Sequence, residues 1–206
     1  MLLTCVETNN NITFPSLQDL ERLLKICIFV LLIYIILSKI MQKSIHINTN
    51  LSLQDLLLSV ENQINSSVTE ICFVFDSDKN LVLTKEGELS FISFTTTELA
   101  LLKNTYFTHN HPKNGFLSVT DIEFAHTWNL EEMRAVTNSE VYVITKPQDG
   151  WNEPQFFQVL RHEKEKIKQA YFKDEITKEV ANQRYFEEVP KIILQKLGIT
   201  FKNIKL

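Results

Sequence analysis

Two histidines, a serine and an aspartate lie close together in the middle of the sequence, between Tyr106 and Asp121. One residue separates His109 from His111, and Ser118 precedes Asp121 by three positions. Neutral imidazoles and a carboxylate are common zinc ligands, and a catalytic zinc keeps its fourth position open to water. The residue types therefore predict a metal site held by His109, His111 and Asp121.

The elements expected around these residues would bring them together. Residues 106–108 are aromatic or β-branched, which is typical of a strand, and residues i and i+2 of a strand face the same way. Pro112 should end the strand, residues 113–115 should form a loop, and Ser118 should cap a helix with Asp121 in its first turn. Both imidazoles and the carboxylate could then converge on one point.

Each of these signals also has a simpler interpretation. A His-x-His pair in a soluble protein is more often a surface pair than a zinc site. Ser-x-x-Asp is an ordinary capping box, in which both side chains bind helix amides. His46, His126 and His162 have no partner at ligand spacing and are expected to be structural or surface residues. The metal-site hypothesis therefore depends on the joint order of its residues.

That order resembles the metal signature of the JAB/MPN (JAMM) metallopeptidases, His-x-His-Pro followed by Ser-x-x-Asp. Six residues separate His111 from Ser118, one fewer than in the eukaryotic deubiquitinating members. The shorter loop and the asparagine between the histidines are more similar to small bacterial and phage-associated JAB-like domains. Such domains also carry Glu-x-x-x-Val-Phe-Asp and Glu-x-Arg-Ala-Val strands, which match residues 70–76 and 132–136, so that the resemblance covers roughly residues 68–147.

The resemblance implies a zinc-dependent hydrolase that cleaves a peptide bond or a lysine isopeptide bond in a protein or peptide substrate, including a ubiquitin-like conjugate. The bound Zn²⁺ would lower the pKa of its water from about 15.7 to near 7. Glu70 would take the proton of that water and pass it to the leaving amine, and Ser118 would donate a hydrogen bond to the oxyanion. Glu86 and Glu88 also precede the histidines and remain alternatives to Glu70.

Two other functions remain open from the sequence. The first is a catalytically inactive MPN-fold interaction module, which the shortened loop and the lack of a Gly-rich segment after the Glu70 strand favour. The second is a phage-derived or toxin-associated processing protein that uses the same chemistry.

Composition limits the class of protein. The chain has 206 residues, is 44% apolar and carries a net charge of -4, which suits one ordinary domain with an appendage. The sequence has no Lys/Arg cluster, so a nucleic-acid partner is not expected. Cys5, Cys27 and Cys72 show no CxxC spacing, which argues against a disulfide framework and against a cysteine-based zinc site.

The N-terminal part of the chain contains a candidate membrane anchor. Residues 1–22 are too polar and acidic to begin a signal peptide. Residues 23–41 follow, and the part of this segment between Lys25 and Lys39 is apolar on all sides. The length approaches the roughly 20 residues that span a bilayer, and both lysines can reach the headgroups. We expect a single uncleaved membrane span of undetermined orientation, followed by a polar linker at 42–51; a helix buried in protein is the alternative.

The remaining sequence predicts an α+β (α/β-like) domain at 52–148, a mixed β-sheet flanked by helices. The resemblance implies the JAB/MPN fold, which is cytidine-deaminase-like. Besides the histidine strand we expect a helix after Ser52, a hairpin, a third strand and two later strands. These strands are predicted at 69–75, 81–83, 91–94, 134–136 and 141–145.

Residues 149–206 should form a C-terminal helical arm. Pro154 suits a first helical position, and Ile176 and Val180 continue the expected helix. In the domain itself Phe73, Phe75 and Phe94 are predicted core residues, because aromatic strand residues are usually buried.

Overall fold

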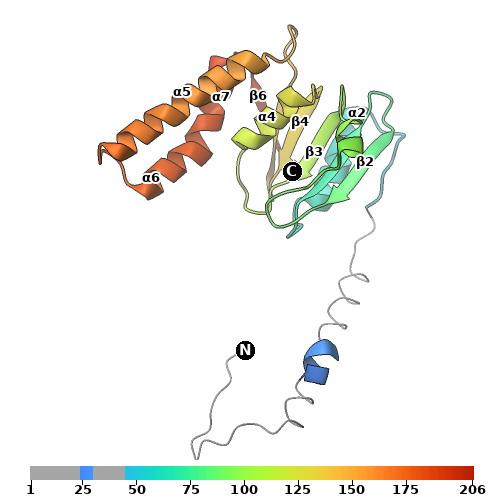
Figure 1. The fold of residues 1–206 in the computed structure, drawn as a ribbon. Helices are drawn as coiled ribbons and strands as arrows, with labels where there is room; N and C mark the ends of the chain where they lie inside the picture. Colours follow the sequence, from blue (N-terminus) through green and yellow to red (C-terminus); the bar gives the residue numbers. More distant parts are fainter. Residues whose placement is uncertain (1–23, 30–44) are drawn as a thin grey trace, which may run out of the picture. The chain divides into compact units, whose positions relative to one another are not determined.

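The computed structural model describes residues 24–29 and 45–206, and residues 46–206 form one compact unit (Figure 1). Of the expected membrane span at 23–41, residues 24–29 are helical, and the remainder lies outside the described residues, as does the segment 1–22. Within the described residues, no helix combines the length and the apolar character needed to cross a bilayer.

The compact unit is built on a six-stranded mixed sheet with the strand order β2-β1-β3-β4-β5-β6. Strand β3 pairs parallel to β4, whereas the other neighbouring strands are antiparallel. The predicted α+β class with a mixed sheet flanked by helices is therefore confirmed. The strands are β1 (Ile71–Phe75), β2 (Leu81–Glu86), β3 (Tyr106–Asn110), β4 (Glu132–Val136), β5 (Glu140–Thr145) and β6 (Phe201–Lys205).

Helices cover both faces of this sheet. Thr108 of β3 donates a hydrogen bond to Glu61 of α2, and the next residue, His109, faces Asp121 of α4. Since successive strand residues point to opposite faces, α2 and α4 lie on opposite sides of the sheet. The helical elements are α2 (Leu53–Ile64), α3 (Thr96–Leu99), α4 (Val119–Thr127), α5 (Glu153–Phe172), α6 (Lys178–Gln183), the π-helix η1 (Arg184–Glu188) and α7 (Val189–Lys196).

The larger hydrophobic core lies on the α4 side. It combines Val74, Phe107 and Met133 from the central strands with Ile122 of α4 and Phe156 of α5. Phe73 and Phe75 alternate with this set and are buried towards the other face, where α2 lies. Both are core residues as predicted, whereas Phe94 is only partly buried against the core.

The predicted third strand at 91–94 is wrong. The Glu88 N–H donates to the Phe91 carbonyl, so the chain turns back after β2 instead of extending the sheet. Gly87 permits this turn, since a Cβ at that position would lie 2.3 Å from the Phe91 oxygen. Residues 91–95 are therefore a loop that leads into α3.

The C-terminal arm also differs from the prediction. Pro154 lies in the first turn of α5 as expected, but α5 ends at Phe172 and Asp174 adopts a positive φ of 56°. Thr177 then caps a separate helix, α6, whose N–H at Val180 binds the Thr177 hydroxyl. The arm returns through α7 to β6, which adds an unpredicted sixth strand to the sheet beside β5.

Candidate metal centre

The first predicted ligand, His109, lies near the end of β3 in the interior of the sheet. Its backbone is opposite Cys72 of β1 and Ala135 of β4, and the residue is 3% exposed. Pairing on both sides fixes the backbone of β3, which gives the imidazole one direction, towards α4.

His111 follows one residue after β3 but remains held by the sheet. Its N–H donates to the Val136 carbonyl of β4 at 2.6 Å, so the extended backbone continues past the strand end. The side chain therefore points to the same face as His109, and the two Nε2 atoms are 2.8 Å apart. The His111 Nδ1 atom binds the Gly115 carbonyl at 3.0 Å, which orients Nε2 towards its neighbour.

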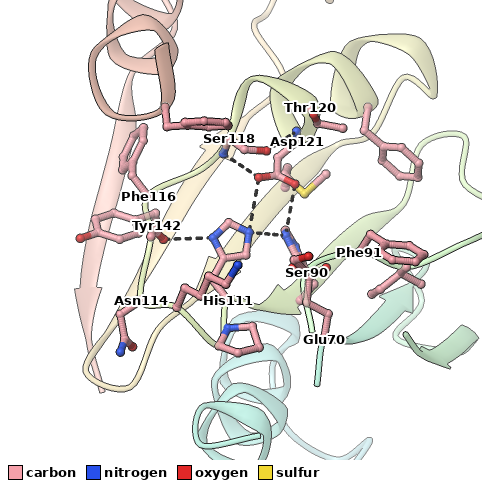
Figure 2. A pocket seen from close by; sticks show the side chains of 18 of the residues that line it. Glu70, Ser90, Phe91, His111, Asn114, Phe116, Ser118, Thr120, Asp121 and Tyr142 are labelled. Carbon is pink, nitrogen blue, oxygen red and sulfur yellow. Dashed lines mark hydrogen bonds and ion pairs between the residues drawn. The ribbon is translucent and has the colours of Figure 1, made fainter. Parts of the chain in front are cut away.

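The third predicted ligand comes from the start of α4. Ser118 is the N-cap, with its hydroxyl accepting from the Asp121 N–H and its own N–H donating to Asp121 Oδ2 at 2.6 Å. The two oxygens of Asp121 also lie 3.3 Å from His109 Nε2 and 3.4 Å from His111 Nε2. The capping box and the metal hypothesis are thus compatible, because the same carboxylate meets the helix amide and both histidines (Figure 2).

His109, His111 and Asp121, called the metal triad below, fit the geometry of a zinc site. Their candidate ligand atoms all lie within 4.8 Å of one another. Zinc bonds of about 2.0–2.1 Å to nitrogen and oxygen give tetrahedral edges of about 3.3–3.4 Å. Each histidine nitrogen lies at such a distance from one oxygen of Asp121, but from a different one: His109 from Oδ1 and His111 from Oδ2. The shorter distance between the two nitrogens would have to open by about 0.5 Å. Two His and one Asp also leave a fourth position, as in catalytic sites.

The charge distribution around the triad favours the anionic form of Asp121. Burial alone would raise the pKa of this carboxyl, but the adjacent His109 and His111 lower it well below its usual value. For His111, burial lowers the pKa, and the hydrogen bond and charge of Asp121 outweigh this and raise it. The carboxylate and the His111 imidazole thus stabilise one another in the charged state, and a divalent cation could take the place of the His111 proton.

Among the three candidate glutamates, Glu70 is the one that faces the triad. It lines the same cleft as the histidines, and Figure 2 shows it beside them on the side away from Asp121. Burial raises the pKa of Glu70. The nearby His109 and His111 act to lower this pKa and Asp121 acts to raise it, and the net effect is a raised pKa. Glu86 instead accepts a hydrogen bond from Thr69, and neither Glu86 nor Glu88 lines the cleft.

The residue between the histidines holds the backbone around Glu70. Asn110 is fully buried, and its side-chain oxygen accepts from the Ile71 N–H at 2.7 Å. Its amide nitrogen donates to the carbonyls of Thr69 and Ser67 at 3.0 and 3.3 Å. One side chain therefore clamps the chain on both sides of Glu70 to the strand that carries the histidines. This role was not evident from the sequence.

The metal triad lies in a cleft of about 1010 Å³. Apolar residues flank it: Figure 2 shows Phe91 on one side of the imidazoles and Phe116 with Tyr142 on the other. Residues of the C-terminal arm, Phe186 and Lys191 among them, also line the cleft. From the sequence the arm could cover the domain, mediate oligomerisation or contact the substrate, but these two residues were not identified, because they lie more than sixty residues from the triad and carry no motif.

Comparison of the chain with protein-family models, with curated proteins and with solved structures gives no significant match. The resemblance of the motif to JAB/MPN metallopeptidases thus rests on the residues of the motif alone.

The other predicted features fall outside this site. His126 is buried between the rings of Trp151 and Phe156, so it is a structural residue as expected. Cys72 is buried within β1 and Cys27 is exposed, while Cys5 lies outside the described residues.

Proposed function

We propose that this chain is a zinc-dependent hydrolase of the JAB/MPN type that cleaves a peptide or lysine isopeptide bond. The observation that carries the proposal is the convergence of the metal triad, with distances of 2.8–3.4 Å between the three side chains, in a cleft that also contains Glu70. When bound, zinc would supply Lewis-acid chemistry, acidifying water and polarising a carbonyl group.

The roles of the protein residues follow from their positions. Glu70 would accept a proton from the attacking water and deliver it to the leaving amine; a carboxyl whose pKa is raised by burial suits such a two-way transfer. Asn110 would keep Glu70 beside the histidines through its bonds to the flanking backbone. Ser118 accepts the Asp121 N–H, which leaves the hydroxyl proton available for the developing oxyanion.

The decisive first experiment measures zinc and cleavage on the full chain. We expect one equivalent of zinc per chain by mass spectrometry, retained in Glu70→Gln and lost in His109→Ala. His162→Ala, which removes an exposed histidine on α5, is the matched control and should keep its zinc. Equal zinc in the parent and His109→Ala would reject the site.

Catalysis is tested separately from metal binding. Incubation with a pool of peptides should give metal-dependent cleavage that Glu70→Gln reduces by at least about 100-fold, the lower range for a lost general acid-base group. Zinc binding without cleavage of linear or isopeptide-linked substrates would support the alternative, a catalytically inactive interaction module. That alternative draws on the capping box, in which Asp121 has a structural role of its own.

We also propose that residues 23–41 anchor the enzyme in a membrane, an idea that comes from the apolar sequence between Lys25 and Lys39. The full chain should then remain in the membrane fraction after carbonate extraction, whereas a chain that starts at His46 should be released. Release of both would reject the anchor without affecting the metal site.

A further inference from the structure

Large apolar side chains are exposed around the cleft that contains the metal triad. Phe91 is 56% exposed and Leu89 is 64% exposed in the loop after β2, and Phe186 is 65% exposed in the π-helix of the arm. Exposed apolar surface that is contiguous at a groove is a mark of a ligand-binding or protein-binding site. All three line the same cleft as the histidines.

One wall of the cleft depends on the C-terminal arm. Phe116, from the loop between the histidines and α4, packs against Tyr142 of β5 at 4.9 Å and against Phe201 of β6 at 5.1 Å, measured between ring centroids. The Lys191 amine of α7 lies 5.5 Å from the centre of the Phe116 ring. Two of the three groups that hold Phe116 therefore come from the arm, which lies outside the recognised motif.

The π-helix of the arm contains Phe186, which lines the cleft. Residues Arg184–Glu188 form a wider turn between α6 and α7, and short π-helical segments are frequent at functional sites. This turn presents Phe186 and Glu187 to the cleft, shortly before Lys191. The arm thus supplies an exposed aromatic side chain to a site whose ligands belong to another part of the fold.

The opposite wall is also apolar. Ile92, Phe94 and Phe124 line the cleft beyond Phe91, and the Phe94 and Phe124 rings are 5.6 Å apart. In Figure 2, Phe91 lies on one side of the imidazoles and the Phe116–Tyr142 pair lies on the other. An extended polypeptide advances about 3.3–3.6 Å per residue, so a chain laid across the triad would place neighbouring side chains on both walls.

Building on the proposed function, we infer that the C-terminal arm forms part of the substrate site. The substrate is an extended, linear polypeptide with bulky apolar residues on both sides of the cleaved bond. Phe186 binds one of these apolar residues. A cleft of about 1010 Å³ is at the upper end for small-molecule sites and suits a peptide segment. Phe186 is a specificity residue in this arrangement, and the reaction itself remains that of the triad and Glu70.

The test uses the full chain carrying Glu70→Gln, loaded with zinc and immobilised. The probe is a Glu-C digest of reduced and alkylated bacterial proteins, and the readout is the set of retained peptides and their dissociation constants. We expect retained peptides to be enriched in Phe, Leu, Ile and Met, and adding Phe186→Ala to weaken binding about 10-fold, the effect of one lost apolar side chain.

Phe172→Ala is the matched control, because Phe172 is 71% exposed on α5 of the same arm and does not line the cleft. Its peptide binding should equal that of the parent. Three results would each overturn the inference. The first is equal peptide binding by the Phe186→Ala and Phe172→Ala variants, and the second is a set of retained peptides that is not enriched in apolar residues. The third is preferential retention of an isopeptide-linked probe.

Parallel measurements separate this inference from the proposed function. If the parent cleaves peptides, and Glu70→Gln abolishes this cleavage while Phe186→Ala leaves it unchanged, the proposed hydrolase activity stands and the role of the arm is rejected. Phe186-dependent peptide binding without any cleavage by the parent would reject the hydrolase and keep the arm as a peptide-binding element.

Discussion

The two faces of the sheet contain buried polar clusters of different kinds. On the α2 face, Arg134 donates to both carboxylate oxygens of Glu61 and also to Glu132. Arg134 and Glu61 are both fully buried. On the α4 face, the metal triad brings two imidazoles and a carboxylate together, and within the described part of the chain the Asp121 carboxylate pairs with the two histidines and with no lysine or arginine.

Adjacent residues of one strand belong to these two clusters. Thr108 donates to Glu61 at 2.8 Å, and His109 faces Asp121 on the other side. A buried charge is tolerated when a partner of opposite charge and further hydrogen bonds compensate it. The α2 cluster is compensated by protein groups alone, whereas the triad offers lone pairs that a cation would complete. The difference supports the proposal that one cluster maintains the fold and that the other could bind a cation.

Removing the cation from the α2 cluster should have the largest effect on stability. In Arg134→Met the Glu61 carboxylate stays buried without its partner, so we expect the free energy of unfolding to fall by about 3–5 kcal/mol. Urea unfolding at neutral pH measures this change. The double variant Arg134→Met/Glu61→Leu should recover part of the loss, because it removes the buried charge of Glu61 as well, while Glu132 stays without its Arg134 partner. If the double variant instead loses as much stability as the two single variants together, the ion pair is not the cause of the loss in Arg134→Met.

Removing the metal should affect the α4 face alone. With free zinc at about 100 times its dissociation constant, binding contributes about 2.7 kcal/mol, and excess EDTA should remove this contribution from the parent. Excess EDTA should leave the free energy of unfolding of His109→Ala unchanged, and it should still lower that of any Arg134 variant that folds. An equal EDTA effect in His109→Ala would locate the stabilising ion elsewhere.

The sequence predicted the α4 face better than the rest of the molecule. His109, His111 and Asp121 were predictable because their positions depend on local rules, namely strand alternation and a helix capping box. The elements that carry them follow the same local rules, and the structure brings the three side chains together.

Other features depend on contacts between distant segments, which local patterns do not report. Residues 91–94 have strand-like composition, but Gly87 and the Glu88–Phe91 hydrogen bond turn them away from the sheet. Strand β6 forms by antiparallel pairing with the edge of β5, a contact between segments that are distant in the sequence. The clamp by Asn110 and the contribution of Phe186 to the cleft arise in the same way, from tertiary packing.

A third buried group, His126, extends the comparison, because this imidazole has neither a charged partner nor ligand neighbours. Among the described residues no group binds either ring nitrogen, and burial lowers the pKa of His126 from 6.5 to about 4. The folded state therefore favours the neutral ring. The stability it contributes is fully present above pH 6.5 and is lost progressively as the pH falls towards 4.

We therefore expect the parent to lose about 2 kcal/mol more stability than His126→Phe between pH 7.5 and pH 5. Urea unfolding at both pH values measures the difference, with His162→Ala as the control that should behave like the parent. A pH dependence that is identical in the parent and His126→Phe would mean that the ring is protonated in the folded protein without cost.

The smallest stability effect should come from Ser118, and it separates the two roles of the capping box. Ser118→Ala removes the cap of α4 and should cost about 1 kcal/mol, whereas Ser118→Gly, a tolerated cap, should cost only a few tenths. Both variants lack the hydroxyl, so a role in stabilising the oxyanion predicts the same loss of cleavage rate, about 10²–10³-fold, in each. If cleavage instead follows stability, with Ser118→Gly nearly as active as the parent, Ser118 acts only by holding Asp121 in place.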